Sequence, residues 1–148
     1  CTKDKEKYFG KIENNTMILN ALGEIIRKYW LVIPEHFPYV ILDEFIIMPN
    51  HVHGIIVIEH NNYGVGNNDR CSLQRNRNMQ SLPKIISQYK SSVTRDIRKQ
   101  FNNYRFRWQK SFFDHIIRDE TSLQNIRTYI RFNPLKWNTD TDNPKNTL

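Results

Sequence analysis

Hydrophobic and polar residues alternate along this chain in segments whose spacing predicts both strands and helices. Strand-forming residues fill Tyr8–Ile12 and Met17–Leu19, and the polar Glu13–Thr16 turn lies between them. This pattern predicts a short hairpin. Asn20 is suited to the N-cap of a helix, and apolar residues recur after it at helical spacing until Pro34. A first helix is therefore expected to follow the hairpin.

Two longer apolar runs predict a central hairpin. Tyr39–Met48 and His51–Glu59 are rich in Val, Ile and Phe, and the turn signal Pro49-Asn50 separates them. Residues 60–80 have a different character, with repeated Asn and almost no apolar periodicity. We interpret residues 60–80 as a long flexible loop within one domain.

A second helix is predicted after Pro83, because apolar residues recur at three- and four-residue steps as far as Phe101. Its cations greatly outnumber its single acid, Asp96, although a solvated charged face is the commoner use of such residues. A last helix is expected from about Glu120 to Phe132, before Pro134. The cations of the second helix are Lys84, Lys90, Arg95, Arg98 and Lys99.

Aromatic residues and cations interleave in residues 105–118, and two interpretations stay open. Such a composition is suited to stacking bases and neutralising phosphates. Alternatively, Phe106, Trp108 and Phe112 are the inward-facing residues of a final strand, since strands bury alternate aromatic side chains.

The composition is that of a single soluble domain spanning residues 1–148. Hydrophobic residues make up 39% and charged residues 25%, which is ordinary for a globular chain. The net charge of +7 favours a polyanionic partner, and nucleic acid over membrane. No apolar run reaches the roughly 20 residues that span a bilayer, and no signal-peptide pattern is present, so we expect a cytoplasmic protein. Cys1 and Cys71 alone do not suit a disulfide framework or a cysteine-based zinc site.

The candidate chemistry lies in two pairs of residues. His51 and His53 share one face of a predicted strand while Val52 points to the other, so two imidazoles converge as candidate metal ligands. Paired histidines also occur as plain polar residues at the rim of a sheet. Tyr129 and Asn133 are four apart on the last predicted helix and are expected to share a face. Core packing is the alternative role for Tyr129.

Four motifs together resemble a known family. In order and spacing, "MPNHVHGIIVIE", "YKSSVTRDI", "RWQKSFFDHIIRDE" and "YIRFNPLKW" resemble the single-tyrosine HUH transposases associated with repetitive extragenic palindromes. The resemblance runs from about Tyr8 to Trp137, with the Asn-rich loop as its variable part. It implies an α+β fold of the HUH endonuclease type. A ferredoxin-like antiparallel sheet would carry the histidines, and a helix would present the tyrosine over them.

The resemblance also implies residue roles. His51 and His53 match the family's metal-binding pair, Tyr129 matches its nucleophile, and Asn133 matches its third ligand. In many relatives this ligand is a glutamine, one methylene longer, so a water can bridge Asn133 to the metal. The expected cation is Mg²⁺ or Mn²⁺. The family usually has a further strand before the position of Cys1, so a truncated or trimmed N-terminus is expected.

The implied activity is DNA transposition by transesterification. A tyrosine hydroxyl with a pKa of about 10 is a weak nucleophile at neutral pH, and a nearby cation favours its phenolate. Attack on single-stranded, hairpin-forming DNA would give a 5′-phosphotyrosine and a free 3′-hydroxyl without ATP. In the family, a monomer or a homodimer with active sites shared between subunits performs this reaction.

DNA contacts are expected from cations of the second helix and of residues 105–118, and His115 is a candidate for supporting the site or a structural histidine. Two other functions remain open. One is a noncatalytic nucleic-acid-binding module on the same fold, and the other is a metal-dependent phosphodiesterase or rolling-circle replication nuclease. The expected DNA contacts are Lys90, Arg95, Arg107, Lys110 and Arg118.

Overall fold

The computed structural model describes residues 1–59 and 81–146. The loop predicted at residues 60–80 lies outside this part of the chain. Among the described residues, no helix combines the length and apolarity that crossing a bilayer requires.

The first hairpin forms as predicted. Strand β1 (Gly10–Glu13) pairs antiparallel with β2 (Thr16–Leu19). Asn14 and Asn15 make the turn, and both have a positive φ, 49° and 60°. A two-residue hairpin turn with positive φ at both positions matches the twist of the strands, and Asn tolerates that conformation.

Helix α1 (Ala21–Leu31) begins at the predicted cap. The Asn20 side-chain oxygen accepts hydrogen bonds from the backbone N–H groups of Leu22 and Gly23, both at 3.0 Å. Pro34 does more than end this helix. It lies in the first turn of the short α2 (Ile33–His36), where its missing N–H costs no hydrogen bond.

The central hairpin contains an irregularity that the sequence pattern does not indicate. Strand β3 (Val40–Ile47) pairs antiparallel with β4 (Val52–Ile58). Leu42 pairs with Ile56, and the next pair is Phe45 with Gly54, so two residues of β3 oppose only Ile55. This is a β-bulge, and the two bulged residues are Asp43 and Glu44.

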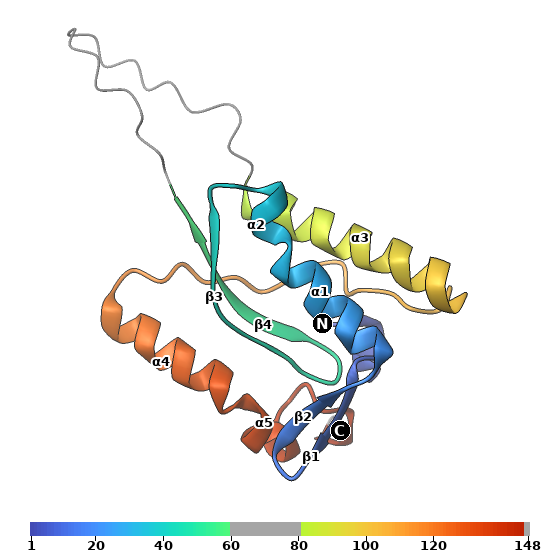
Figure 1. Cartoon of the computed structure of the whole chain (residues 1–148). Coiled ribbons are helices and arrows are strands. Elements are labelled where there is room, and N and C mark those ends of the chain that lie inside the picture. Colours follow the sequence, from blue (N-terminus) through green and yellow to red (C-terminus); the bar gives the residue numbers. More distant parts are fainter. Residues whose placement is uncertain (60–80, 147–148) are drawn as a thin grey trace, which may run out of the picture.

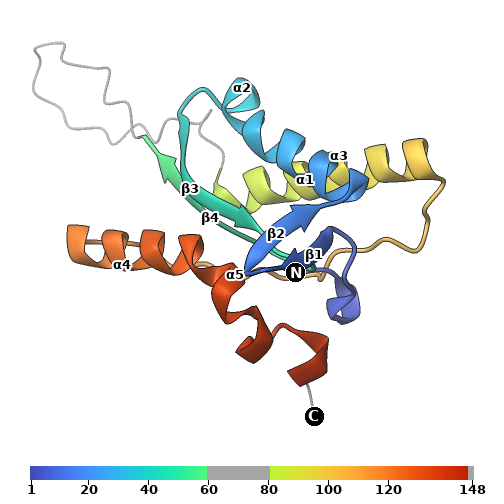
Figure 2. The same ribbon diagram turned by 60° about the horizontal axis from the view of Figure 1, so that its bottom comes forward.

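Helices cover the central hairpin on both faces. Helices α1 and α3 (Leu82–Phe101) lie on one side of β3 and β4, and α4 (Glu120–Arg131) lies on the other (Figures 1 and 2). The main core is on the α1–α3 side, where Trp30 stacks on Phe45 and meets Tyr89 edge to face. A Cβ at Gly54 would lie 2.3 Å from the Trp30 ring, so only glycine allows this close packing.

The final strand predicted within residues 105–118 is wrong. In this described stretch the backbone forms only an isolated bridge between Thr2 and Trp108. Two hydrogen bonds flank the bridge, Lys3 N–H to Arg107 O at 2.9 Å and Gln109 N–H to Cys1 O at 3.0 Å. One isolated bridge with its two flanking hydrogen bonds is too short to form a β-strand ladder.

The inward-facing interpretation is correct for part of the same segment. Phe106 is fully buried, and Trp108 packs beside it and against Phe9. Phe112, the third residue of this interpretation, is only partly buried, with the Lys90 ammonium 5.8 Å from its ring centroid. The neighbouring Phe113 is 94% exposed.

The last predicted helix is confirmed, but it does not carry both residues of the expected pair. Helix α4 ends at Arg131, and Phe132 leaves the helical conformation with φ −94° and ψ 7°. Asn133 begins a new short helix, α5 (Asn133–Lys136), with Pro134 in its first turn. Tyr129 and Asn133 therefore lie on different helices and do not share one helix face. Pro134 has no N–H to donate to the carbonyl four residues earlier, and its ring would clash with that carbonyl, so α4 cannot continue unbroken through it.

The predicted α+β class with antiparallel strands and packed helices is confirmed, and the arrangement is compatible with a ferredoxin-like fold. The described strands form two two-stranded sheets, β1–β2 and β3–β4, where a single sheet was expected. Three short 3₁₀ helices complete the described chain: η1 (Lys3–Lys5), η2 (Trp137–Thr139) and η3 (Pro144–Asn146).

Candidate metal and tyrosine site

The two histidines converge as their spacing predicts. His51 immediately precedes β4 and His53 lies in it, so both face the α4 side while Val52 packs against the main core. The two Nε2 atoms are 3.0 Å apart. Two imidazole nitrogens this close need either a shared proton or a cation between them.

A buried asparagine sets the tautomer of His51. The Asn50 side-chain NH₂ donates to the backbone oxygens of Lys5, at 2.8 Å, and Asp142, at 2.7 Å. Its Oδ1 is therefore the atom that lies 2.8 Å from His51 Nδ1, and an oxygen there only accepts. The proton of His51 is consequently on Nδ1, and the Nε2 lone pair is directed toward His53. A hydrogen bond of this kind commonly orients a metal-binding histidine.

Burial keeps both imidazoles neutral. Burial, together with charge repulsion from the adjacent His53, lowers the pKa of His51 to about 3. Burial also lowers the pKa of His53, against the raising effect of nearby carboxylates. The neutral imidazole is the form that binds metal, so the pair is ready for a cation at neutral pH.

Tyr129 lies beside this pair. Its ring centroid is 5.3 Å from that of His53, with the ring planes at 75°. Its side chain is 45% exposed. The structure thus brings the predicted tyrosine next to one predicted histidine and leaves it accessible from solvent.

Asn133 is buried, with 1% of its surface exposed. Its Oδ1 atom has no hydrogen-bond partner in the described part of the chain. Leaving a buried acceptor unpaired costs about 1–3 kcal/mol, so such an oxygen is a natural ligand for a cation. None of the contacts seen among the described residues joins Asn133 to either histidine. By its chemistry, an amide oxygen together with two neutral imidazoles would fit a divalent metal.

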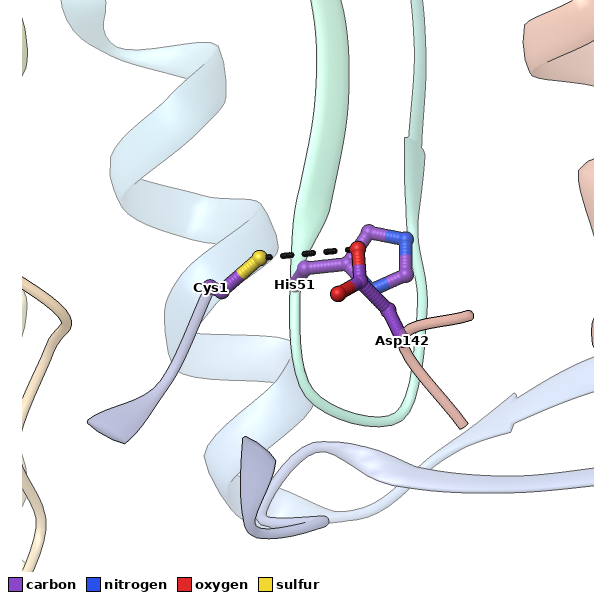
Figure 3. A group of neighbouring side chains, drawn as sticks. All are labelled: Cys1, His51 and Asp142. Carbon is purple, nitrogen blue, oxygen red and sulfur yellow. Dashed lines mark hydrogen bonds between the residues drawn. The ribbon is translucent and has the colours of Figure 1, made fainter. Parts of the chain in front are cut away.

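A carboxylate that the sequence analysis did not single out also lies at the histidine pair. Ligand atoms of Cys1, His51 and Asp142 lie within 4.8 Å of one another (Figure 3). The Cys1 thiol donates to Asp142 Oδ2 at 3.8 Å, and Asp142 Oδ1 is 3.5 Å from Lys5 Nζ. Cys1 and Asp142 come from opposite ends of the given sequence and His51 from its central hairpin, so no local spacing could have revealed the group.

Two ion pairs connect α4 to the bulge in β3. Arg127 binds Asp43 through both Nε and Nη2, with Nε 3.0 Å from Oδ1. Arg131 Nε lies 2.6 Å from Glu44 Oε2. The hydrogen bond from Arg127 is the main reason that the pKa of Asp43 is below its usual value. The sequence analysis missed these pairs, because an Asp or Glu in a strand does not indicate its partner 84 or 87 residues away.

The expected DNA contacts lie in two places. Lys90 and Arg95 line a shallow hollow of about 470 Å³ on α3, together with Arg98 and Trp108. Lys90 is already engaged, because its ammonium donates to the backbone oxygen of Gln109 at 3.0 Å.

The remaining expected DNA contacts, Arg107, Lys110 and Arg118, are exposed on the extended segment after α3. His115 is also exposed, and it lines a second hollow together with Arg118. None of the contacts seen among the described residues joins His115 to His51 or His53.

Comparison with known proteins identifies related chains. A family model described as "Transposase IS200 like" matches residues 73–133, a span that contains Tyr129 and Asn133 but not the two histidines. A Haemophilus influenzae protein named "Uncharacterized protein" is 40% identical over 149 residues, which cover 95% of this chain and 79% of the relative.

A second Haemophilus influenzae protein carries a functional name. "Putative REP-associated tyrosine transposase" is 29% identical over 104 residues, or 69% of this chain. The chain spans 53% of that relative's length. No solved structure matches the chain significantly.

Proposed function

Because this chain belongs to the family of IS200-like transposases, we propose that it cuts and rejoins single-stranded DNA with Tyr129 as the nucleophile. The observation that carries this proposal is the position of Tyr129, with its ring 5.3 Å from a histidine pair whose Nε2 atoms converge to 3.0 Å. A tyrosine needed only for packing would be buried in the core, whereas this one is 45% exposed.

In this proposal His51, His53 and Asn133 hold Mg²⁺ or Mn²⁺. The histidines are neutral and one presents an oriented lone pair, and Asn133 Oδ1 is a buried oxygen without a donor. A bound divalent cation would withdraw charge from a nonbridging phosphate oxygen and favour the phenolate form of a nearby tyrosine.

The reaction itself is a transesterification at phosphorus. The Tyr129 oxygen forms a bond to phosphorus, the bond from phosphorus to the 3′ oxygen breaks, and the departing oxygen takes up a proton. The product is a 5′-phosphotyrosine and a free 3′-hydroxyl. Because one phosphodiester replaces another, a 3′-hydroxyl can reverse the step without ATP.

The proposed substrate is single-stranded DNA next to a hairpin. A flexible strand can bring its phosphate to a half-exposed tyrosine more easily than a duplex can. The exposed cations Arg107, Lys110 and Arg118 and the hollow with Lys90 and Arg95 are the proposed backbone contacts. One chain already contains the tyrosine and the histidines side by side, so a monomer has all the proposed catalytic groups.

The proposal is tested with a labelled single-stranded hairpin oligonucleotide, Mn²⁺ and denaturing electrophoresis. Wild type should give a shifted, protease-sensitive band, and Tyr129→Phe should give none while still binding DNA in a native gel. Replacing both His51 and His53 by Ala should remove metal-dependent cleavage. Tyr104→Phe is the matched control, because Tyr104 is 63% exposed and plays no part in the proposed site.

Three results would contradict the proposal. Cleavage that survives in Tyr129→Phe would exclude the tyrosine as nucleophile. Release of ordinary 5′-phosphate ends would indicate a hydrolytic nuclease. Binding without any adduct in wild type would indicate a noncatalytic nucleic-acid-binding protein.

A further inference from the structure

The helix that carries Tyr129 has few apolar anchors. Ile130 is the one residue of α4 that is fully buried, at 2% exposure. Leu123 and Ile126 are only partly buried. A helix fastened by a narrow apolar stripe can roll about its own axis, because dispersion and hydrophobic contacts are not directional.

The bulge in β3 supplies directional anchors. Because Asp43 and Glu44 together oppose Ile55, two neighbouring carboxylates reach the face covered by α4. In a regular strand, neighbouring side chains point to opposite faces, and only one carboxylate could reach α4.

The two arginines are four residues apart, so they leave α4 from the same flank. Each residue of an α-helix rotates the chain by about 100° about the helix axis. Tyr129 is two residues from each arginine, a rotation of about 200°, so its side chain leaves α4 from the opposite flank. Ile130 lies between these directions and faces the sheet. The arginines connect one flank of α4 to β3, and the tyrosine on the other flank is held next to His53 of β4.

Burial distinguishes the two pairs. The side chains of Asp43 and Arg127 are 20% and 25% exposed, and Arg127 engages the carboxylate with two nitrogens. Glu44 is 25% exposed, but its partner Arg131 is 61% exposed. Bidentate geometry and shielding from solvent make the Asp43–Arg127 pair the stronger constraint on α4.

We propose that Asp43 and Glu44 are positioning residues for the DNA-cleavage reaction, which they serve by fixing the rotation of α4 and thereby the place of the Tyr129 hydroxyl. This inference rests on the proposed function of Tyr129. A roll of about 10° moves an atom about 6 Å from a helix axis by about 1 Å. A misplacement of about 1 Å in a reacting group costs on the order of 100-fold in rate.

The test compares wild type with the double variant Asp43→Asn/Glu44→Gln, which removes both charges and keeps the side-chain size. Glu24→Gln is the matched control, because it removes an exposed carboxylate that pairs with Arg27 on α1. A reversed pair, Glu44→Arg with Arg131→Glu, tests whether the attraction itself matters.

Three quantities are measured: the single-turnover rate of adduct formation at saturating DNA and Mn²⁺, the DNA dissociation constant, and the melting temperature. For the double variant we expect a rate on the order of 100-fold lower, with DNA affinity within about threefold of wild type. Glu44→Arg alone should be slow, and adding Arg131→Glu should restore most of the rate. An unchanged rate in the double variant, or no gain from reversal, would overturn the proposal.

Amide hydrogen exchange in α4 makes the test independent of catalysis. Loss of the ion pairs should speed exchange in residues 123–131 of the double variant and leave α1 and α3 unchanged. Unchanged exchange in α4 would show that the carboxylates do not hold the helix. If wild type forms no adduct at all, the proposed function fails, and the exchange result still decides whether Asp43 and Glu44 fix α4.

Discussion

Replacing Asn50 by alanine tests the geometry of the histidine pair most sharply. Asn50 is fully buried and makes three hydrogen bonds, accepting one from His51 and donating to the backbone of Lys5 and Asp142. Each such bond contributes about 1 kcal/mol net. We therefore expect the free energy of unfolding to fall by about 3 kcal/mol, which for a chain of this size lowers the melting temperature by roughly 6–12 °C.

The same substitution frees the tautomer of His51. Without an acceptor at Nδ1, the proton can move to Nε2, and the lone pair is then lost from the side that faces His53. Loss of such a supporting bond typically weakens metal binding by about 10- to 100-fold. Calorimetric titration of Mn²⁺ into the metal-free protein measures this change, and the exposed amide variant Gln88→Ala is the control.

Asn50→Asp separates the two effects. An aspartate keeps an acceptor for the His51 N–H but cannot donate to the carbonyls of Lys5 and Asp142. The protein should therefore lose stability, while Mn²⁺ affinity stays within about threefold of wild type. If the Asp variant loses as much Mn²⁺ affinity as the Ala variant, the tautomer argument is refuted.

Three further predictions concern other parts of the molecule. Gly54→Ala should lower the free energy of unfolding by about 1–3 kcal/mol, because the new Cβ would lie 2.3 Å from the Trp30 ring; a thermal melt equal to wild type would contradict this. Because the pKa of Asp43 is lowered in the folded protein, the unfolded chain takes up this proton at a higher pH than the folded chain does. The ion pair therefore stabilises the folded protein fully above about pH 4, and this stabilisation is lost progressively as the pH falls further. The stability difference between wild type and Asp43→Asn should then shrink from pH 6 to pH 3 in denaturant titrations, whereas a constant difference would exclude the ion pair as its source. Arg95→Ala and Lys110→Ala should each reduce the slope of log affinity against log salt by about 0.7 on single-stranded DNA, and an unchanged slope would remove that residue from the interface.

Local signals explain the parts of the fold that the sequence predicts well. The Asn14-Asn15 turn, the Asn20 cap and the turn before His51 each depend on a few neighbouring residues, and each occurs where the pattern places it. The convergence of His51 and His53 also follows from strand geometry alone. Local spacing was misleading at Phe132. It predicted that Tyr129 and Asn133 share one helix face, but the chain leaves the helix at Phe132, before it reaches Asn133.

The features that sequence reasoning missed depend on contacts between distant segments. The bulge that presents Asp43 and Glu44 has no signature in its own composition, and their arginine partners lie on α4. The approach of Asp142 to His51 joins the C-terminal segment to the central hairpin. The final strand was predicted from buried aromatics, yet Phe106 is buried by packing on Tyr8 and Phe9 without belonging to a ladder.

The most direct test of the central claim is to identify the atom that becomes attached to DNA. Wild-type protein is incubated with the hairpin oligonucleotide and Mn²⁺, the covalent product is digested with protease and nuclease, and the modified peptide is sequenced by mass spectrometry. We predict a nucleotide 5′-phosphate on Tyr129 and a free 3′-hydroxyl on the released strand. A nucleotide attached to another residue, or a released strand ending in a 3′-phosphate, would contradict the account.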